Sequence, residues 1–256
     1  GALSMPSSAR YEYLLRLGDS ALILSQRLGE WCGKGPALEE DMALTNTALD
    51  LLGQARLWLS LAAEQAGDGA DEDSLAYLRD DRAFRNLLLV EQPNGSYADT
   101  LARQFLFDAW SSLALRRLLA SSDPAIAAIA EKAVKEVSYH LRRSSDLVVR
   151  LGDGTALSQA MLQGAIDKLW PYHHELFIGD AIDAAMVASG IGFDPASLKD
   201  EWLAYVREVL NEATLKVPAA GGWMPKGGKQ GLHSEHLSKL LAEMQILQRS
   251  HPGASW

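Results

Sequence analysis

The spacing of apolar residues along this 256-residue chain constrains its fold more than any other feature. Apolar side chains recur at intervals of three and four, and almost no segment alternates as a β-strand does. Four long segments follow the helical spacing, at about 12–31, 37–65, 97–120 and 122–151. Shorter helices are expected at about 81–91, 158–169, 180–189, 195–215 and 234–249. The pattern predicts an all-α protein, an antiparallel four-helix bundle with additional shorter C-terminal helices.

No internal repeat, low-complexity tract or shift in composition marks a domain boundary in the sequence. We expect residues 1–10 to be a tag remnant and disordered N-terminus, and residues 11–256 to form a single domain. The longest irregular stretch, at 217–231, is expected to be a loop.

Charge and cysteine content exclude several classes of function. The net charge of −9 argues against a nucleic-acid partner, which usually requires a basic face. No apolar run approaches the ~20 residues that span a bilayer, and the first ten residues contain no signal-peptide core. The single cysteine, Cys32, excludes an internal disulfide and fits a reducing compartment. We therefore expect a cytoplasmic protein without a membrane segment.

Polar residues fall on helix faces that are otherwise apolar. In the second long segment, helical spacing places Asn46 and Asp50 on the same face as Ala43, Leu57 and Leu61. We expect this face to point into the bundle. Gly53 lies on it and would allow close approach of another backbone.

The third and fourth long segments carry similar residues. Asp108 shares a face with Phe105 and Leu115, which predicts that its carboxyl group points inward. His140 shares a face with Val137 in the fourth segment. Glu136 lies four residues before His140, so the two side chains can touch.

Two interpretations are open for these polar residues. One is a metal or proton-transfer site built from Asp50, Asp108, Glu136 and His140. The other is a hydrogen-bonded network in which the carboxylates pair with one another or with arginines such as Arg56 and Arg103. A di-iron carboxylate bundle needs a Glu-x-x-His pair from each of two helices. None of the six histidines has an acidic residue three positions before it, so we favour the network.

Three further features have weaker functional interpretations. His173, His174 and Glu175 are contiguous, so on a helix they cannot all face one ion. His233 and His236 could converge on a metal, but we favour a surface position, a hydrogen bond at the helix start or a partner contact. The glycine-rich loop at 226–231 (KGGKQG) carries two lysines and could receive phosphate, yet it lacks the context of a P-loop, and we expect an ordinary mobile loop.

Four segments resemble a known family. They are 15–32 (LRLGDSALILSQRLGEWC), 49–56 (LDLLGQAR), 86–95 (NLLLVEQPNG) and 231–243 (GLHSEHLSKLLAE). Together they closely resemble the structural C subunits of bacterial phenylacetyl-CoA epoxidases, which belong to the ferritin-like superfamily. The resemblance extends from about residue 15 to the end of the chain.

The resemblance implies a ferritin-like bundle that pairs with a homologous catalytic subunit. In this family the di-iron centre lies in the catalytic subunit, a reductase supplies electrons from NADPH, and the complex epoxidises the ring of phenylacetyl-CoA with dioxygen. This chain is then expected to bind no cofactor itself, and self-association is a further possibility.

The resemblance also implies which residues replace the ligands of an inherited metal site. Asp50 occupies the acidic place of the first Glu-x-x-His, with Gly53 at the histidine place. Glu136 occupies the acidic place of the second, with Tyr139 at the histidine place. With Asp108 and His140, these residues form the candidate vestigial site. The implied function is that of a non-catalytic structural subunit. An autonomous carboxylate-metal oxidoreductase with an atypical site and a helical adaptor protein stay open as alternatives.

Overall fold

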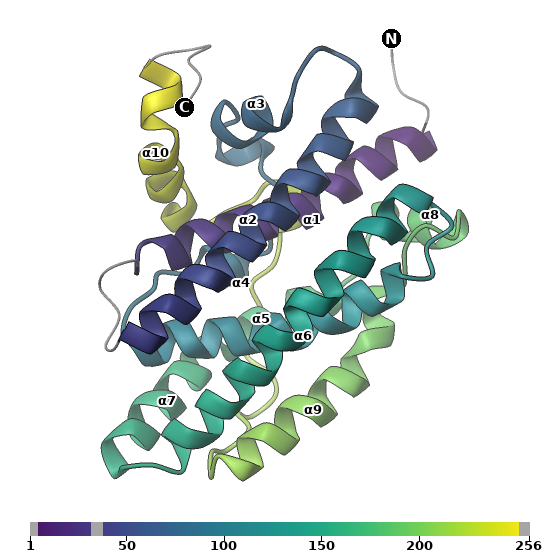
Figure 1. Cartoon of the computed structure of the whole chain (residues 1–256). Coiled ribbons are helices and arrows are strands. Elements are labelled where there is room, and N and C mark those ends of the chain that lie inside the picture. The colour runs from purple at the N-terminus through teal and green to yellow at the C-terminus, as the bar shows by residue number, and fades with distance from the viewer. Residues whose placement is uncertain (1–4, 32–37, 251–256) are drawn as a thin grey trace. The chain divides into compact units, whose positions relative to one another are not determined.

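The computed structural model describes residues 5–31 and 38–250, which form helices joined by loops (Figure 1). No strand occurs within these ranges, which confirms the prediction of an all-α protein. The chain separates into two compact units, Gly1–Pro93 with Lys226–Trp256, and Asn94–Pro225. The second unit is thus inserted into the sequence of the first. The expectation of a single domain over 11–256 stays a prediction, as does that of a tag remnant at 1–10, although residues 5–10 belong to the first helix.

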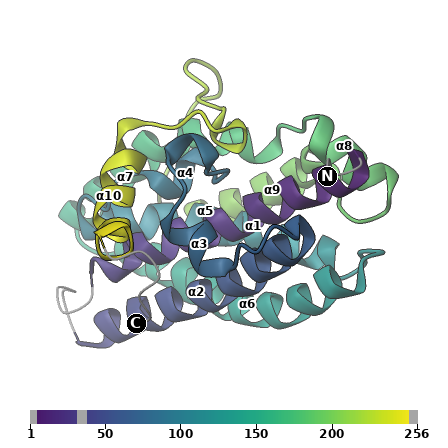
Figure 2. The same cartoon turned by 90° about the horizontal axis from the view of Figure 1, so that it is seen from above.

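Unit 1 is built on two long helices, α1 (Met5–Gly29) and α2 (Leu38–Ala66), which lie side by side (Figure 2). Their backbones come close at Gly18, where an added Cβ would lie 2.7 Å from a methyl carbon of Leu59 and 3.2 Å from the Cβ of Trp58. A larger residue at this position would therefore push the two helices apart.

The remaining elements of unit 1 are α3 (Glu72–Tyr77), η1 (Asp81–Ala83), α4 (Leu88–Glu91), η4 (Gly228–Gln230) and α10 (Glu235–Ser250). Buried Gln245 holds α10 to the end of α3, since its amide donates to the carbonyl oxygens of Ala76 at 3.2 Å and Arg79 at 2.8 Å. The guanidinium of Arg79 in turn pairs with Asp19, a fully buried carboxylate of α1. Segments distant in sequence are therefore joined by buried polar contacts.

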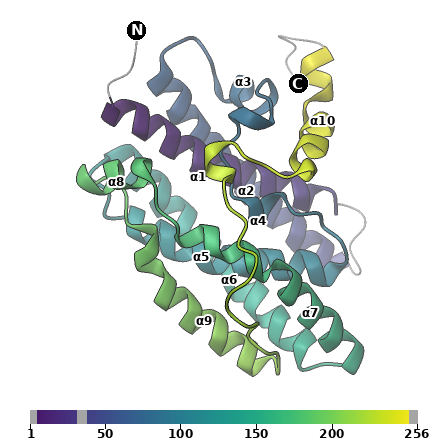
Figure 3. The ribbon, with the colours of Figure 1, turned by 180° about the vertical axis from the view of Figure 1, so that it is seen from behind.

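Unit 2 contains α5 (Tyr97–Leu118), α6 (Pro124–Gly152), α7 (Ala156–Leu169), η2 (Trp170–Phe177), α8 (Ala181–Ala188), η3 (Pro195–Leu198) and α9 (Lys199–Glu212). Helix α5 packs against α6, and α7 and α9 flank it (Figure 3). The indole of Trp202 on α9 is fully buried and donates to the carbonyl oxygen of Leu106 at 3.2 Å. This contact fixes α9 against the middle of α5.

Side-chain caps explain where the long helices of unit 2 begin. Ser96 and Asp99 form a capping box at the start of α5. Asp123 accepts hydrogen bonds from the backbone at the start of α6, where Pro124 is the first helical residue. Helix α7 ends before Pro171, and the chain continues there in a 3₁₀ helix.

The observed elements differ from the expected ones in two places. The helix expected at 81–91 is broken into η1 and α4, because Phe84 and Leu87 adopt extended backbone conformations between them. A short helix that was not expected, α3, begins where Asp71 and Ser74 form a capping box.

The expected inward face of α2 is also wrong. Asn46 is exposed and Leu57 is 38% exposed, whereas the buried positions of α2 include Leu51, Ala55 and Trp58. Helix α2 carries apolar residues on both faces, so its spacing fits two orientations equally well. Contact with α1 buries the face that carries Leu51, Ala55 and Trp58.

None of the helices in the described ranges is long and apolar enough to cross a membrane.

Candidate functional site

The carboxyl group of Asp108 is the best-defined buried polar site in unit 2. As expected, its side chain points inward and is 2% exposed. The amide of Gln104, one turn earlier on α5, donates to Oδ1 at 2.7 Å, and the hydroxyl of Ser144 on α6 donates to Oδ2 at 3.0 Å. Helical spacing places Gln104 and Asp108 on one face of α5, and Ser144 faces them from α6.

Burial controls the ionisation of this carboxyl group. Removal from water raises the pKa of Asp108 to about 7, and the two hydrogen bonds from Gln104 and Ser144 offset the rise only in part. The expected arginine partners are placed elsewhere. Arg103 donates to the side-chain oxygen of Asn94 at 2.8 Å, and Arg56 is exposed on α2. The side chains that bond to the Asp108 carboxyl group, Gln104 and Ser144, are both neutral.

Polar atoms beside Asp108 leave hydrogen-bonding capacity unused. The Oε1 atom of Gln104 and the hydroxyl of Ser112, one turn after Asp108, are buried and have no hydrogen-bond partner in the structure. Such groups are commonly satisfied by an ordered water molecule. The face of α5 from Gln104 to Ser112 is therefore a polar stripe inside an apolar helix pair.

The other candidate residues of α6 divide between the core and the surface. His140 is 5% exposed, as predicted from its spacing. Tyr139, at one of the implied histidine places, is 56% exposed and meets the His140 ring edge to face at 5.6 Å between centroids. Glu136 is half-buried.

The candidates on α2 belong to unit 1. Asp50 is half-buried, and a Cβ added at Gly53 would meet no atom within 4 Å. The close backbone approach expected at Gly53 is therefore not made by any part of the chain that the structure describes.

This donor set does not fit a di-iron centre. Such a centre takes a carboxylate and an imidazole from each Glu-x-x-His helix, but Gly53 has no side chain and the Tyr139 ring is mostly in solvent. Among residues 8–31 and 42–246, whose side chains the structure describes, no group of three or more His, Cys, Asp or Glu side chains is arranged to hold a metal ion.

A second buried polar cluster lies in unit 1 and was missed by sequence reasoning. His233 does not converge with His236 on a metal but binds Glu91, with 2.8 Å between Nδ1 and Oε1. Both side chains are fully buried. Ser234 also bonds to this carboxylate, through its backbone N–H at 3.0 Å and its hydroxyl at 2.6 Å. The pair joins two of the segments that carry the family resemblance, 86–95 and 231–243.

The glycine-rich loop at 226–231 has a structural reason for its composition. A Cβ at Gly228 would lie 2.3 Å from the carbonyl oxygen of Asn86, and one at Gly231 would lie 2.4 Å from that of Arg82. Gly227 and Gly231 also have positive φ angles of 113° and 85°. The glycines thus let this loop lie directly on the backbone of residues 82–86.

His173 is a core residue of unit 2. Its ring stacks on Trp202 with centroids 5.1 Å apart and planes 8° apart, and it also contacts Trp170 at 4.4 Å. Burial lowers the pKa of His173 to about 4, although a hydrogen bond with the Trp170 carbonyl raises it. The imidazole is therefore neutral near pH 7. Cys32 lies outside the described residues.

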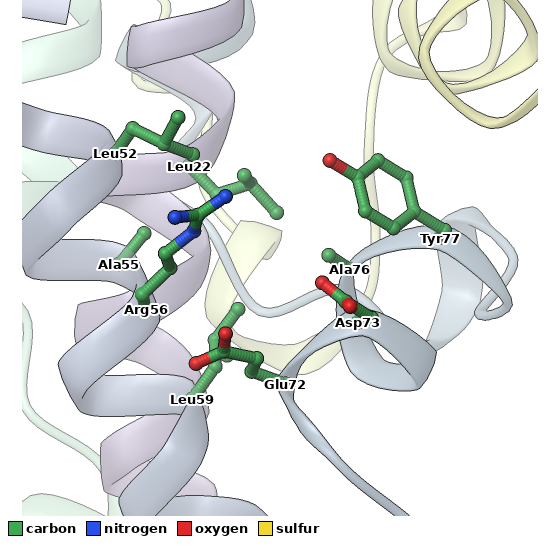
Figure 4. Close-up of a pocket in the computed structure, with 9 residues that line it drawn as sticks. All are labelled: Leu22, Leu52, Ala55, Arg56, Leu59, Glu72, Asp73, Ala76 and Tyr77. Atoms are coloured by element: carbon green, nitrogen blue, oxygen red, sulfur yellow. The ribbon is translucent and has the colours of Figure 1, made fainter. Parts of the chain in front are cut away.

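A small pocket lies between α2 and α3 in unit 1 (Figure 4). Arg56 from α2 lines one wall, opposite Glu72, Asp73 and Tyr77 from α3. Its volume of about 10 Å³ is enough for about one water molecule. This pocket is too small for an organic substrate.

Comparison with known proteins gives a family match and two similar proteins. Residues 3–256 match the model of a family described as phenylacetic acid catabolic protein. The chain is 57% identical over 244 residues to the C subunit of 1,2-phenylacetyl-CoA epoxidase from Escherichia coli (strain K12), covering 95% of this chain and 98% of that protein. It is also 27% identical over 169 residues to the A subunit of the same enzyme, covering 65% of this chain and 54% of that protein. The chain is therefore similar to two proteins that are themselves named as parts of one enzyme.

Proposed function

This chain belongs to the phenylacetic acid catabolic protein family, and we propose that it is the structural C subunit of a 1,2-phenylacetyl-CoA epoxidase. The observation that carries the proposal is 57% identity to the C subunit of such an enzyme over nearly the full length of both chains. On this proposal the chain takes part in aerobic breakdown of phenylacetate through the complex in which it assembles.

We propose that the chain has no catalytic centre of its own. Gly53 and Tyr139 supply no imidazole at the places where the ligand pattern requires one. Asp108 supports the same conclusion, because its carboxyl oxygens are bound to the side chains of Gln104 and Ser144. The di-iron centre then belongs to a homologous catalytic subunit, for which the A subunit is the natural candidate given its 27% identity to this chain.

The proposed partner contact is one between two helical bundles. The pairs α1–α2 and α5–α6 are the long helices from which a ferritin-like bundle would be built. Two homologous bundles can bury more than ~2,000 Å² in a permanent complex. Such an interface would hold the helices of the catalytic subunit in register and limit the access of water to its active site.

Co-expression with a tagged A subunit tests the proposal. We expect the two chains to co-purify in equal amounts, and we expect turnover of phenylacetyl-CoA, with reductase added, to depend on this chain. Failure to co-purify, or turnover that is unchanged when this chain is omitted, would refute the proposed function and favour a helical adaptor.

The iron content of the separately purified chain tests the absence of a catalytic centre. We expect far less than one iron per chain, whereas about two would support an autonomous metal oxidoreductase. An Asp108→Asn variant adds a second test. It should assemble and turn over as the wild type does, and loss of turnover in a fully assembled complex would assign Asp108 a direct part in the chemistry.

A further inference from the structure

We infer that Glu91 and His233 form a charged latch that holds the strap (residues 226–234) onto residues 82–91. The strap is the segment through which the chain re-enters unit 1 from unit 2. Glu91 lies two residues before the point where the chain leaves unit 1. The latch therefore joins the two segments of unit 1 between which unit 2 is inserted.

The contacts of His233 fit a doubly protonated ring. Nδ1 lies 2.8 Å from Oε1 of Glu91, and Nε2 lies 2.7 Å from the carbonyl oxygen of Phe84. A carbonyl oxygen can only accept, so Nε2 donates to it. A neutral imidazole has one donor, so beside an ionised Glu91 only the imidazolium ion satisfies both contacts. On this inference His233 is the cation of a buried ion pair.

The contacts of Glu91 suit a hydrogen-bond acceptor. Oε1 lies 2.8 Å from Nδ1 of His233, and Oε2 accepts from the backbone N–H of Ser234 at 3.0 Å and its hydroxyl at 2.6 Å. The two opposite charges and their hydrogen bonds compensate for removal from water, which a lone charge at this position could not do.

Charged side chains of α1 and of the segment beneath the strap make contacts of their own. From α1, Arg27 donates to the backbone oxygens of Glu91 at 2.7 Å and His236 at 3.5 Å, and Asp19 pairs with Arg79. From the segment beneath the strap, Arg85 pairs with Glu12 at 3.0 Å. Glu91 and His233 are therefore a charge pair that directly joins the two segments.

The strap itself is shaped to depend on this latch. Gly228 and Gly231 let its backbone lie against that of residues 82–86 with no side chain between them. A segment seated in this way offers few large apolar groups to bury, since Leu232, its one large aliphatic residue, is 69% exposed. The hydrogen-bonded pair of Glu91 and His233 adds a polar anchor to this segment. Loss of either charge should open the strap before the helices of unit 1 unfold.

Hydrogen exchange on the full-length chain tests the latch. We expect Glu91→Gln and His233→Gln to accelerate exchange at residues 227–234 by about 100-fold or more, because each leaves a buried charge without its partner. Exchange in α1 should change much less. Ser238→Ala is the matched control, because it removes an exposed hydrogen bond to Asp81 in the same region. Its strap should exchange as in the wild type.

Nitrogen-15 NMR of the wild-type chain tests the latch without any substitution. We expect both ring nitrogens of His233 to carry protons at pH 7. An unprotonated ring nitrogen at this pH would overturn the latch, and so would wild-type exchange at residues 227–234 in a folded Glu91→Gln variant.

Discussion

The carboxyl group of Asp108 on α5 lies 3.0 Å from the hydroxyl of Ser144 on α6, and that hydroxyl lies 3.3 Å from the carbonyl oxygen of Leu141. This contact can be satisfied in two ways. An ionised Asp108 accepts the Ser144 proton, whereas a protonated Asp108 donates to Ser144, which then donates to Leu141. The junction of α5 and α6 thus accommodates both protonation states of a carboxyl group whose pKa is about 7.

The first prediction concerns the stability of the Asp108→Asn variant. In the folded chain the pKa of Asp108 is raised to about 7, so the folded state binds this proton more tightly than the unfolded state. The free energy of unfolding of the wild type therefore falls by up to about 4 kcal/mol as the pH rises from about 4 to about 7, because the folded state loses the Asp108 proton. Asparagine is neutral and can donate to Ser144, so the variant should be more stable than the wild type at pH 8.

Urea unfolding at pH 5 and pH 8 measures this difference. Asp146→Asn, on the exposed face of α6, is the matched control and should leave the pH dependence unchanged. An Asp108→Asn variant that is less stable than the wild type at pH 8 would show that the carboxylate itself stabilises the fold.

The second prediction concerns His173. Its pKa is lowered to about 4 in the folded chain, so the unfolded chain takes up this proton first. Stability from the neutral imidazole is present above about pH 6.5 and is lost as pH falls toward 4, by about 2 kcal/mol after allowance for solvent screening. His173→Phe, which keeps a ring against Trp202, should remove this loss.

Thermal unfolding between pH 4 and pH 7 measures the effect. Asp108 and His173 act in opposite directions over this range, so the wild-type curve should be flatter than that of His173→Phe. A His173→Phe curve that keeps the wild-type slope would contradict the assignment, as would NMR titration of His173 near its ordinary pKa.

The third prediction compares two glycines in helices of unit 2. A Cβ at Gly152 would lie 2.4 Å from the carbonyl oxygen of Ala213, whereas one at Gly164 would meet nothing within 4 Å. Gly152→Ala should destabilise the chain by about 1–3 kcal/mol, because the end of α6 must move away from the end of α9. Gly164→Ala should stabilise it by about 0.5–1 kcal/mol through higher helix propensity. Chemical unfolding of both variants checks the contrast, and equal effects would rule out the close contact at Gly152.

The fourth prediction concerns Gly53 on α2. Because a Cβ at this position meets no atom within 4 Å, Gly53→Ala should stabilise the separate chain by about 0.5–1 kcal/mol. Calorimetry of the isolated chain and co-purification with the A subunit should be compared. A variant that is more stable alone but co-purifies less well would place Gly53 at the interface with its partner, whereas destabilisation of the separate chain would contradict the open surroundings of Gly53.

The sequence predicts a helix boundary well where a capping or helix-breaking residue lies directly beside it. Asp123 and Pro124 start α6 because a side-chain oxygen and a fixed φ angle suit that position regardless of tertiary context. Asp71 and Ser74 form a capping box at the start of α3, and this local pattern also predicts a helix start. Helical spacing also placed Asp108 and His140 in the core, since each lies on a single apolar stripe.

The rest depended on contacts that spacing does not encode. Helix α2 is apolar on two faces, so its sequence does not determine which face α1 covers. Asn46 was predicted to point inward, but it is exposed. Glu91 and His233 are 142 residues apart, and no local rule pairs them. A signal did exist, since an acidic residue ends the apolar run LLLV and a buried charge requires a partner.

The insertion of unit 2 within unit 1 has a consequence for synthesis on the ribosome. Unit 2 is continuous from Asn94 to Pro225, so all of its residues have been made before the strap and α10 exist. Unit 1 lacks Gln245 and His233 until translation reaches them. Domains generally fold as units while the chain emerges. The first segment of unit 1, Gly1–Pro93, must therefore wait until the later segment is made, and the surfaces that α10 and the strap will cover stay exposed.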